Sequence, residues 1–585
     1  MTTRADNEAG EQKNQDSASA TAADADTTAD NSTATATDEP GTAAESPSTP
    51  AELPGAAAEP SSVTAETSST TAAPPSATAA GPGASEADNA GDAARDTARH
   101  GVFQRAWSGL NQHFGAAAAA FVVVAGIFGI VFAAITPPFW GHDEITQFGR
   151  AYQVAHGGVT PERIVDDRGI SYGGQIPVSI DAMMGYAFSD YNSRPPEPAP
   201  MAAESGAYDR LGAAPVTTSD TKQMWFTNTA AYSPVAYVPA ALGIRIAEAT
   251  GLDVNGMVLA TRLAGLLAYL VLVGFALRAL RGFRIQWLAF TVAVLPIAIF
   301  QAGTVTADTI TNALAILVSC LLVKGVFLGS RLTKTEVVAA LATTLALPLS
   351  KPTYVILAML VVLIPARQYG FGKILRWLPW CFAALGAALF AVWMKIAAPT
   401  TDGMGLMRKQ AEWDSVRPDD QLSGILSDPP HFVNVFIDSI WYRDEKWFTQ
   451  FFGELGFSYI DVPATTILAC LLALAVSIGI ADRLTGNRWR TWAVLLTVAA
   501  SVAMVYVTLY MSFTPVDYWL IDGVQGRYFV PLAIAGFAVL LRWMPLRLTD
   551  ARGVTPLRGP AITIVVATAV ALAAAAIKYN VMVWG

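Results

Sequence analysis

The sequence predicts an all-α polytopic membrane protein preceded by a disordered N-terminal tail. Hydrophobic residues make up 53% of the 585 residues and charged residues only 15%, which is too apolar for an ordinary soluble domain. Residues 1–100 contain no Phe, Trp, Tyr or Ile, whereas the rest of the chain repeats apolar runs long enough to cross a bilayer. We therefore divide the chain into a tail, 1–100, and a transmembrane domain, 101–585.

The tail is acidic and rich in Ala, Thr and Ser. It holds 17 Asp and Glu against 4 Lys and Arg, a net charge of −13, so the rest of the chain carries +4 within the total of −9. A segment with so few large apolar side chains cannot bury enough surface to offset the entropy lost on ordering, so we predict a disordered cytoplasmic tail. The low isoelectric point reflects this tail, and neither part predicts a nucleic-acid partner.

Eleven apolar runs are predicted to cross the bilayer as helices. Helices satisfy their own backbone polar groups in lipid, whereas membrane strands would alternate in polarity, which these runs do not. Cys320, Cys381 and Cys470 lie inside such runs without metal-ligand spacing, so we interpret them as packing residues. The predicted spans are 116–135, 257–280, 286–303, 308–328, 335–350, 352–366, 376–397, 461–481, 490–511, 527–543 and 560–582.

Clusters of Arg and Lys predict how the chain is oriented. Six clusters, one before the first run and five in later connections, all fall on the cytoplasmic side if the chain crosses eleven times, starting inside and ending outside. The apolar stretch Tyr232–Ala249 is then a helix lying in the outer interface rather than a span, and a twelve-span chain is the alternative. Two large extracytoplasmic loops result, 137–256 and 400–460.

Two adjacent carboxylates follow the first predicted span. A Pro-Pro pair ends the helix, and Asp143 and Glu144 come soon after it, close to the bilayer surface. A carboxylate at that depth can take a proton from a sugar hydroxyl while an anionic lipid leaving group lies beside it, or it can hold a divalent cation. The alternative is that both acids cap the helix predicted over Ile145–His156, where negative charge favours the N-terminus.

Short motifs along the body of the chain resemble domain-of-unknown-function family 2142. That family consists of bacterial integral membrane proteins, which are similar to the lipid-phosphosugar-dependent glycosyltransferases of the GT-C fold. The resemblance covers roughly residues 115–545 and rests on several motifs in the same order. The motifs are Pro137-Pro-Phe, Asp143-Glu144, Phe148–Tyr152, Tyr232–Tyr237, Arg262–Gly265, Thr306–Asp308, Ser350–Tyr354, Phe452–Gly456 and Val524–Pro531.

The resemblance implies a GT-C-like helical bundle with a catalytic first outer loop. In GT-C enzymes an acidic residue of this loop is the catalytic base or a metal ligand, so the resemblance places that role on Asp143, with Glu144 beside it. These two residues are also the ones that would hold a divalent cation if the reaction uses one. A Gly-His pair stands before the acids where relatives more often have Pro-Asp-Glu, so His142 is either an additional functional group or a solvated loop residue.

Cations near the outer ends of predicted spans are candidates for binding a lipid-carried phosphate. Lys351 lies between two apolar runs, where an ionisable side chain is either functional or reaches the interface along its apolar stem. Arg527 begins a span on the outer side, against the positive-inside trend, and a guanidinium suits phosphate. Arg262 is a weaker candidate because it can simply anchor its helix, and Asp308 either caps a helix or belongs to the site.

Aromatic and polar side chains supply the substrate-binding candidates. Trp441 and Tyr442 lie in an aromatic stretch of the second loop, which is typical of the membrane interface and also offers stacking faces for sugar rings. Two further candidates belong to the motifs around the predicted phosphate-binding cations. The full set is His142, Asp308, Tyr354, Trp441, Tyr442 and Gln525.

The resemblance and the charge pattern together predict a glycosyltransferase of the bacterial cytoplasmic membrane with an extracytoplasmic active face. The donor would be a polyprenyl-phosphate-linked monosaccharide, and the acceptor a cell-envelope glycan or glycolipid. Asp143 would deprotonate the acceptor hydroxyl, and Lys351 and Arg527 would stabilise the departing phosphate, with inversion at the anomeric carbon. The alternatives are a lipid or solute transporter or flippase, which needs a polar path and usually inverted repeats, and a non-catalytic scaffold of an envelope-assembly complex.

Overall fold

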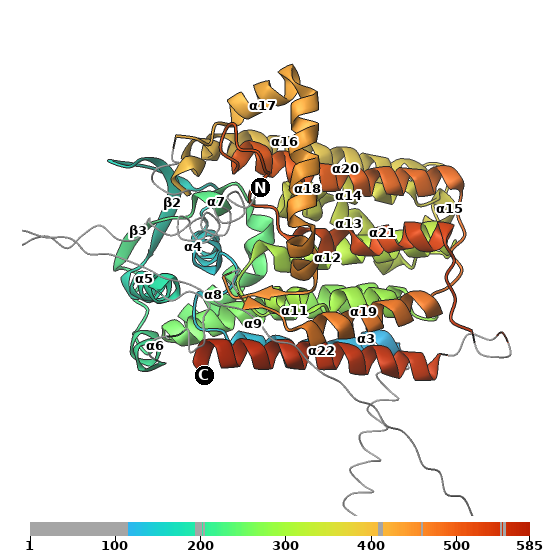
Figure 1. Ribbon diagram of the computed structural model, residues 1–585, viewed down its shortest axis with the longest axis horizontal. Helices are drawn as coiled ribbons and strands as arrows, with labels where there is room; N and C mark the ends of the chain where they lie inside the picture. Colours follow the sequence, from blue (N-terminus) through green and yellow to red (C-terminus); the bar gives the residue numbers. More distant parts are fainter. Residues whose placement is uncertain are drawn as a thin grey trace, which may run out of the picture. The chain divides into compact units, whose positions relative to one another are not determined.

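The computed structural model describes most of the chain that follows the predicted tail. The described residues are 115–193, 202, 205–407, 414–457, 460–549, 553 and 557–585. The predicted tail itself, 1–100, lies outside the described residues. Most of the described residues are helical (Figure 1).

Seven helices in this part of the chain are long and apolar enough to cross a membrane. Each of them overlaps one of the predicted spans, so the sequence predicts these seven helices correctly. They are α3 (Ala116–Ile135), α9 (Val254–Ala279), α12 with η2 (Ala307–Leu322 and Val323–Phe327), α16 with flanking helical turns η5 and η6 (Leu378–Ala397 within Leu375–Met404), α20 (Arg488–Ser512), η8 with α21 (Gly526–Phe529 and Val530–Trp543) and α22 (Arg558–Trp584).

The other four predicted spans are helical but shorter or interrupted. The run 286–303 is divided because Pro296 forces the preceding residue out of the helical conformation, and Leu295 accordingly has a ψ of 138°. The predicted count of eleven spans therefore stays a prediction. The segments are α10 (Gln286–Ala293) with α11 (Pro296–Ala302), α13 (Lys334–Ser350), η3, α14 and η4 (Pro352–Tyr354, Val355–Met359 and Leu360–Leu363, followed by α15, Ala366–Tyr369), and α19 (Ala464–Ile480).

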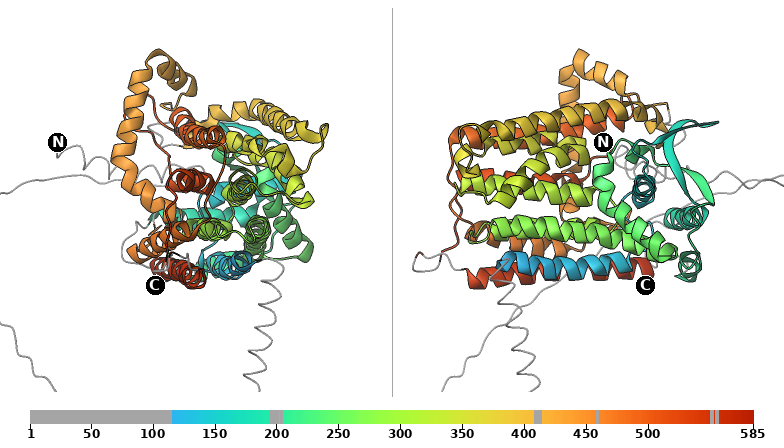
Figure 2. Two further views of the ribbon diagram at one scale, coloured as in Figure 1. Left: turned by 90° about the vertical axis from the view of Figure 1, so that its right-hand side faces the viewer. Right: turned by 180° about the vertical axis from the view of Figure 1, so that it is seen from behind.

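The long helices run side by side, and α12 lies among them (Figures 1 and 2). Every residue of α12 is buried, and the helix packs against α9, α13 and α21. Large apolar side chains are instead exposed on outer helices, such as Leu267 and Val271 on α9 and Ile577 on α22, each more than half exposed. Exposed apolar side chains of this kind suit surfaces that face lipid.

A small antiparallel sheet corrects the all-α prediction for the segment after α4 (Glu144–Ala155). Strands β1 (Glu162–Asp166), β2 (Gly169–Pro177) and β3 (Thr221–Trp225) pair in the order β1-β2-β3. A tight turn at Asp167-Arg168 joins the first two strands, and a Cβ at Gly173 would collide with the Met224 carbonyl oxygen of β3. Helices α5 (Val178–Ser193) and α6 (Ser205–Gly212) lie in the chain between β2 and β3.

The stretch Tyr232–Ala249 is helical from Pro234 onward, as the sequence predicts for most of it. It contains η1 (Pro234–Tyr237), which follows the short α7 (Thr227–Ala230), and α8 (Val238–Thr250), which packs against α4 and α9. With 13 residues α8 is too short to span a bilayer. Its exposed face carries a stripe of apolar side chains, so the predicted place in a membrane interface fits this helix but stays a prediction: Val238, Leu242 and Ile246.

The second predicted loop, 400–460, also contains regular structure. Helix α17 (Pro418–Ser427) is followed by the 24-residue α18 (Pro429–Phe452), and the two-residue strands β4 (Glu454–Leu455) and β5 (Ile460–Asp461) pair after it. In Figures 1 and 2 the axis of α18 is close to perpendicular to the long helices. The segment is therefore built around a helix that crosses the bundle.

Candidate functional site

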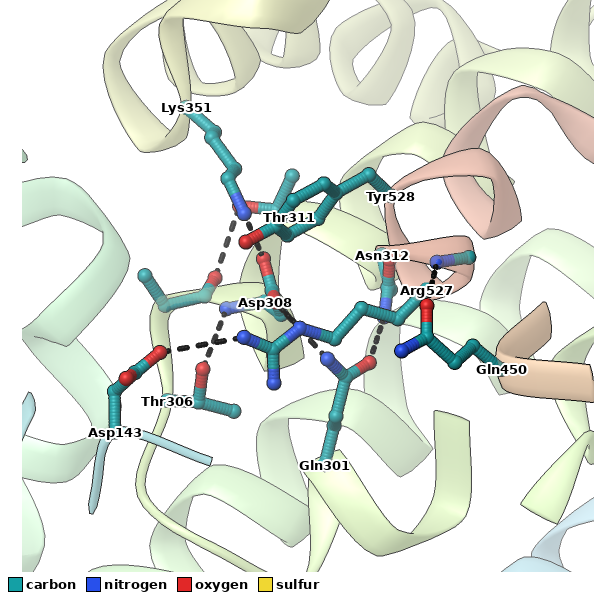
Figure 3. Close-up of polar contacts among 12 residues, drawn as sticks. Asp143, Gln301, Thr306, Asp308, Thr311, Asn312, Lys351, Gln450, Arg527 and Tyr528 are labelled. Atoms are coloured by element: carbon teal, nitrogen blue, oxygen red, sulfur yellow. Dashed lines mark hydrogen bonds and ion pairs between the residues drawn. The ribbon is translucent and has the colours of Figure 1, made fainter. Parts of the chain in front are cut away.

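Four charged side chains from distant parts of the sequence meet at one place (Figure 3). Arg527 Nη2 lies 3.2 Å from Asp143 Oδ2, and Arg527 Nε lies 3.8 Å from Asp308 Oδ2. Lys351 Nζ donates to Asp308 Oδ1 at 2.6 Å. The structure thus brings together the predicted base, two of the three predicted phosphate-binding cations and the predicted substrate-binding aspartate.

Helix ends position all four charged groups. Asp143 precedes α4, and Asp308 lies in the first turn of α12, where Thr306 Oγ1 accepts from its backbone N–H. Lys351 follows the last residue of α13, and Arg527 lies in η8, at the start of α21. Asp143 has a φ of 52°, a left-handed conformation that aspartate tolerates better than most residues and that separates its side chain from that of Glu144.

Burial and charge balance distinguish the members of this cluster. The side chains of Arg527, Asp308 and Lys351 are between 5% and 11% exposed, whereas that of Asp143 is 36% exposed. Two cations and two carboxylates balance the charge of the cluster, and this pairing offsets the free-energy cost of burying charged groups. Arg527 Nη1 is buried and has no hydrogen-bond partner among the described residues, so one donor of the cluster remains available to an anion.

Uncharged side chains hold the carboxylate of Asp308 in place. Gln301 Nε2 donates to Asp308 Oδ2 at 2.9 Å, and Asn312 Nδ2 donates to Gln301 Oε1 at 2.9 Å. Both amides are buried within apolar helices. Neither amide is among the predicted site residues, although a polar residue within an apolar run is the pattern that indicates such positions.

Aromatic rings lie next to the two cations of the cluster, Lys351 and Arg527. Lys351 Nζ lies 4.3 Å from the ring centre of Tyr528 and 5.9 Å from that of Tyr232, and the Arg527 guanidinium lies 5.4 Å from the Tyr528 ring. Tyr354, a predicted candidate, donates its hydroxyl to the Tyr528 backbone carbonyl at 2.7 Å. Burial raises the pKa of Tyr232 to about 12, so this ring stays neutral at physiological pH.

Glu144 belongs to a different ion pair from that of its neighbour Asp143. Its carboxylate is fully buried and pairs with Arg262, with Nε to Oε1 at 2.8 Å and Nη2 to Oε2 at 2.6 Å. The backbone N–H groups of Gly141 and Val305 donate to the same carboxylate. Arg262 in turn donates to three backbone carbonyls at the end of α3: Ala133, Thr136 and Pro137. Both residues thus fix the turn that carries Asp143.

His142 is buried rather than solvated. It is 2% exposed, and its ring meets the ring of Phe300 edge-on at 5.4 Å. Burial, and then the positive charge of Arg527, hold the pKa of His142 well below its ordinary value, while hydrogen bonding to the Glu454 backbone acts in the opposite direction. Of the two predicted alternatives, a solvated histidine does not fit this burial. The ring is neutral and lies close enough to Arg527 to feel its charge.

The neutral state of His142 predicts a pH dependence of stability. Because the pKa of His142 is lower in the folded chain than in the unfolded chain, the unfolded state binds more protons below about pH 6.5. Each further pH unit of acidification then lowers the free energy of unfolding by about 1.4 kcal/mol. We expect this loss between pH 6.5 and 5 to disappear in His142→Asn and to persist in His431→Asn, whose histidine is exposed. Equilibrium unfolding in detergent micelles at several pH values measures the slope, and equal slopes in both variants would contradict the assignment.

The remaining predicted residues are divided between the cluster and its surroundings. Gln525 precedes Gly526, the first residue of η8, and its Oε1 is buried without a hydrogen-bond partner among the described residues. Trp441 is 79% exposed on the outer face of α18, and Tyr442 meets Trp519 edge-on. The structure does not bring these two aromatic residues into the charged cluster.

The chemistry of the cluster suits an anionic ligand beside a base. Lys351 and Arg527 present positive charge, and Arg527 has an unused donor, while Asp143 is the most exposed carboxylate of the cluster. Within the described ranges, no group of three or more His, Cys, Asp and Glu side chains has the arrangement of a metal site. The carboxylate of Glu144 is already engaged by Arg262 and two backbone N–H groups.

Comparison with known proteins gives one family. A family model described as a predicted membrane protein (DUF2142) matches residues 127–535, which include all of the charged cluster. No curated protein and no solved structure matches the chain. The match covers well over half of the sequence, and the chain is therefore a multi-pass membrane protein that belongs to the DUF2142 family.

Proposed function

We propose that this protein is a GT-C-like membrane glycosyltransferase that moves a monosaccharide from a polyprenyl-phosphate carrier to a cell-envelope glycan or glycolipid. The observation that carries the proposal is the 3.2 Å contact between Asp143 and Arg527 in a cluster that also holds Lys351. A partly exposed carboxylate next to two buried cations suits a reaction that needs a base beside a phosphate leaving group.

The proposed reaction begins at Asp143. Its carboxylate takes the proton of the acceptor hydroxyl as the hydroxyl oxygen attacks the anomeric carbon of the donor sugar. The bond between that carbon and the phosphate oxygen breaks, the configuration is inverted, and polyprenyl phosphate leaves. The proton on Asp143 then passes to solvent, for which the 36% exposure of its side chain provides a route.

Lys351 and Arg527 hold the phosphate in this scheme. The unused Nη1 donor of Arg527 and the Lys351 ammonium are suited to oxygens that gain negative charge as the sugar leaves. Asp143 and Asp308 offset these cations before the donor binds. Phosphate on Arg527 replaces the contact with Asp143, which frees the carboxylate to act as a base. Glu144 and Arg262 have positioning roles in the proposal, because each is engaged by the other and by the backbone.

The proposed orientation puts the cluster on the extracytoplasmic side of the bacterial cytoplasmic membrane, with the N-terminus in the cytoplasm. The cluster lies at the beginning of α12, the end of α13 and the beginning of α21, whereas basic residues such as Arg331 and Arg542 lie at the opposite ends of these helices. Connections at that opposite end contact one another, for example Arg542 Nη2 with the Gly486 carbonyl at 3.1 Å. The positive-inside rule then favours eleven spans with the basic end inside.

Glycan analysis of a deletion strain tests the proposed function. We expect one type of sugar to be missing from the envelope and its polyprenyl-phosphate form to accumulate, with both changes reversed by the wild-type gene. The purified chain in detergent should then transfer the same sugar from a synthetic polyprenyl-phosphate donor, which a transporter or flippase cannot do. An unchanged envelope, or purified protein that fails to transfer the missing sugar, would contradict the proposal.

A further inference from the structure

Helix α18 carries three different stripes along its surface. One stripe is buried against the bundle and the other two are exposed, one of them apolar and one polar. The helix crosses the bundle almost at right angles, and its C-terminal part packs against η8 of the charged cluster (Figures 1 and 2). The three stripes and the direction of the helix together indicate which sides of α18 face protein, lipid and water.

The buried stripe holds the segment 521–526, which leads directly into Arg527. Four successive turns of α18 each bond to this segment through one side chain. Ser439 Oγ accepts from Ile521 N at 2.8 Å, Arg443 Nη2 pairs with Asp522 Oδ1 at 2.8 Å, Trp447 Nε1 donates to the Val524 carbonyl at 2.9 Å, and Gln450 Oε1 accepts from Gly526 N at 2.9 Å.

The segment also touches the backbone of α18. A Cβ at Gly526 would collide with the Trp447 carbonyl oxygen and would come within 2.6 Å of the Phe451 backbone nitrogen, so the approach requires glycine. Because these contacts end one residue before Arg527, the position of that guanidinium depends on where α18 lies.

The apolar stripe of α18 lies on the side that faces away from this segment. Its five members recur at helical spacing and are between 40% and 79% exposed. The neighbouring α17 adds Leu422 and Leu426, which are 41% and 72% exposed. The stripe consists of Val433, Ile437, Ile440, Trp441 and Phe448. One exposed carboxylate, that of Asp444, lies on the same face, between Ile440 and Phe448.

A polar stripe runs next to the apolar one. Asn434, Asp438 and Glu445 are exposed and recur at i, i+4 and i+11. A helix surrounded by water would be polar over its whole outer surface, and a helix that spans lipid would be apolar all round. Adjacent apolar and polar stripes, with a tryptophan between them, are instead typical of a helix that lies in a membrane interface.

We infer that α18 lies in the plane of the bilayer interface, with its apolar stripe in the lipid and its polar stripe in water. The partner is thus a lipid surface, and the same helix that binds it holds the segment 521–526, which leads into Arg527. Membrane contact and the placement of Arg527 are thereby coupled through one element. This inference concerns a lipid surface and is independent of the proposed sugar transfer.

Site-directed spin labelling of the full-length chain in phosphatidylethanolamine and phosphatidylglycerol vesicles tests the inference. Cys381 is exposed and is replaced by Ser, whereas Cys320 and Cys470 are buried and can remain. Single cysteines are then introduced and labelled with a nitroxide, and collisions with oxygen and with a water-soluble nickel chelate are measured. The positions are Ile437 and Trp441 on the apolar stripe, Asp438 and Glu445 on the polar stripe, and Val435 as the buried control.

We expect labels at 437 and 441 to collide with oxygen and to lose access to nickel, and labels at 438 and 445 to show the reverse. The label at 435 should be shielded from both reagents. Equal access to nickel on both exposed stripes would place α18 in water and overturn the inference. Shielding of 437 and 441 from both reagents, with dipolar coupling between labels, would show a second copy of the chain on this stripe and would equally overturn it. Because no donor or acceptor is present, these outcomes do not depend on the proposed enzymatic activity.

Discussion

The Glu144→Gln variant is expected to be about 3–5 kcal/mol less stable than the wild type, the usual cost of removing one partner of a buried ion pair. The side chains of Arg262 and Glu144 are 3% and 0% exposed, so the arginine left behind has no water to replace the lost charge. Glutamine has nearly the same shape, but its amide group faces two further donors, the N–H groups of Gly141 and Val305. The loss therefore reflects charge and hydrogen bonding rather than packing.

Equilibrium unfolding in mixed detergent micelles measures this effect against a matched control. Asp181→Asn is the same type of change in a pair with Lys222, whose side chain is 57% exposed, so it should cost under about 1 kcal/mol. A double variant, Glu144→Leu with Arg262→Met, should recover only part of the stability, because three backbone carbonyls lose their donor. A Glu144→Gln variant as stable as the Asp181→Asn control would show that the pair does not hold the turn before α4.

The two adjacent acids illustrate what sequence reasoning can and cannot separate. Asp143 and Glu144 are indistinguishable as neighbouring carboxylates close to a bilayer, and their sequence predicts a base, a metal ligand or a helix cap for either one. The left-handed backbone at Asp143 turns the two side chains into different surroundings. Glu144 pairs with Arg262, which is 118 positions away in the sequence, and Asp143 pairs with Arg527, which is 384 positions away. Partners so distant in the chain cannot be read from local spacing.

The helical spans and the meeting of the cations were predictable for general reasons. Apolar length predicts the seven long helices, because lipid requires a fully paired backbone. An ionisable residue at the end of an apolar run is costly unless it is paired, so Lys351 and Arg527 could be expected to share carboxylate partners. The sequence therefore predicts which charged residues meet, and their role in binding a substrate stays a prediction.

Other features depend on packing that no local pattern encodes. The sheet of β1, β2 and β3 interrupts a region in which helices were expected, and β3 is separated from β2 by more than 40 residues. Strand pairing over such distances depends on tertiary contact more than on propensity. The buried stripe of α18 is similarly invisible in the sequence, because its aromatic residues look alike whether they face lipid, sugar or the segment 521–526.

The Asp143→Asn variant is expected to fold normally but to lose about 100- to 10,000-fold in kcat for sugar transfer, the usual contribution of a positioned general base. Asparagine adopts the left-handed conformation as readily as aspartate does, so the turn should be preserved. The change also removes one negative charge from Arg527, which leaves the guanidinium more available to phosphate. The KM for the polyprenyl-phosphate donor should therefore stay the same or fall.

This division between kcat and KM distinguishes a base from a residue that merely supports the fold. A structural role for Asp143 would raise the donor KM by displacing Arg527, or would lower the stability of the variant, whereas loss of a base lowers kcat alone and flattens the acidic limb of the pH–rate profile. Asp517→Asn is the matched control, since Asp517 also has a left-handed backbone, with a φ of 65°, and is exposed away from the cluster. Transfer from a synthetic donor by both purified variants, at saturating and limiting donor, measures the two constants. Undiminished kcat in Asp143→Asn would remove Asp143 as the base, and with it the chemical basis for placing the reaction at this cluster.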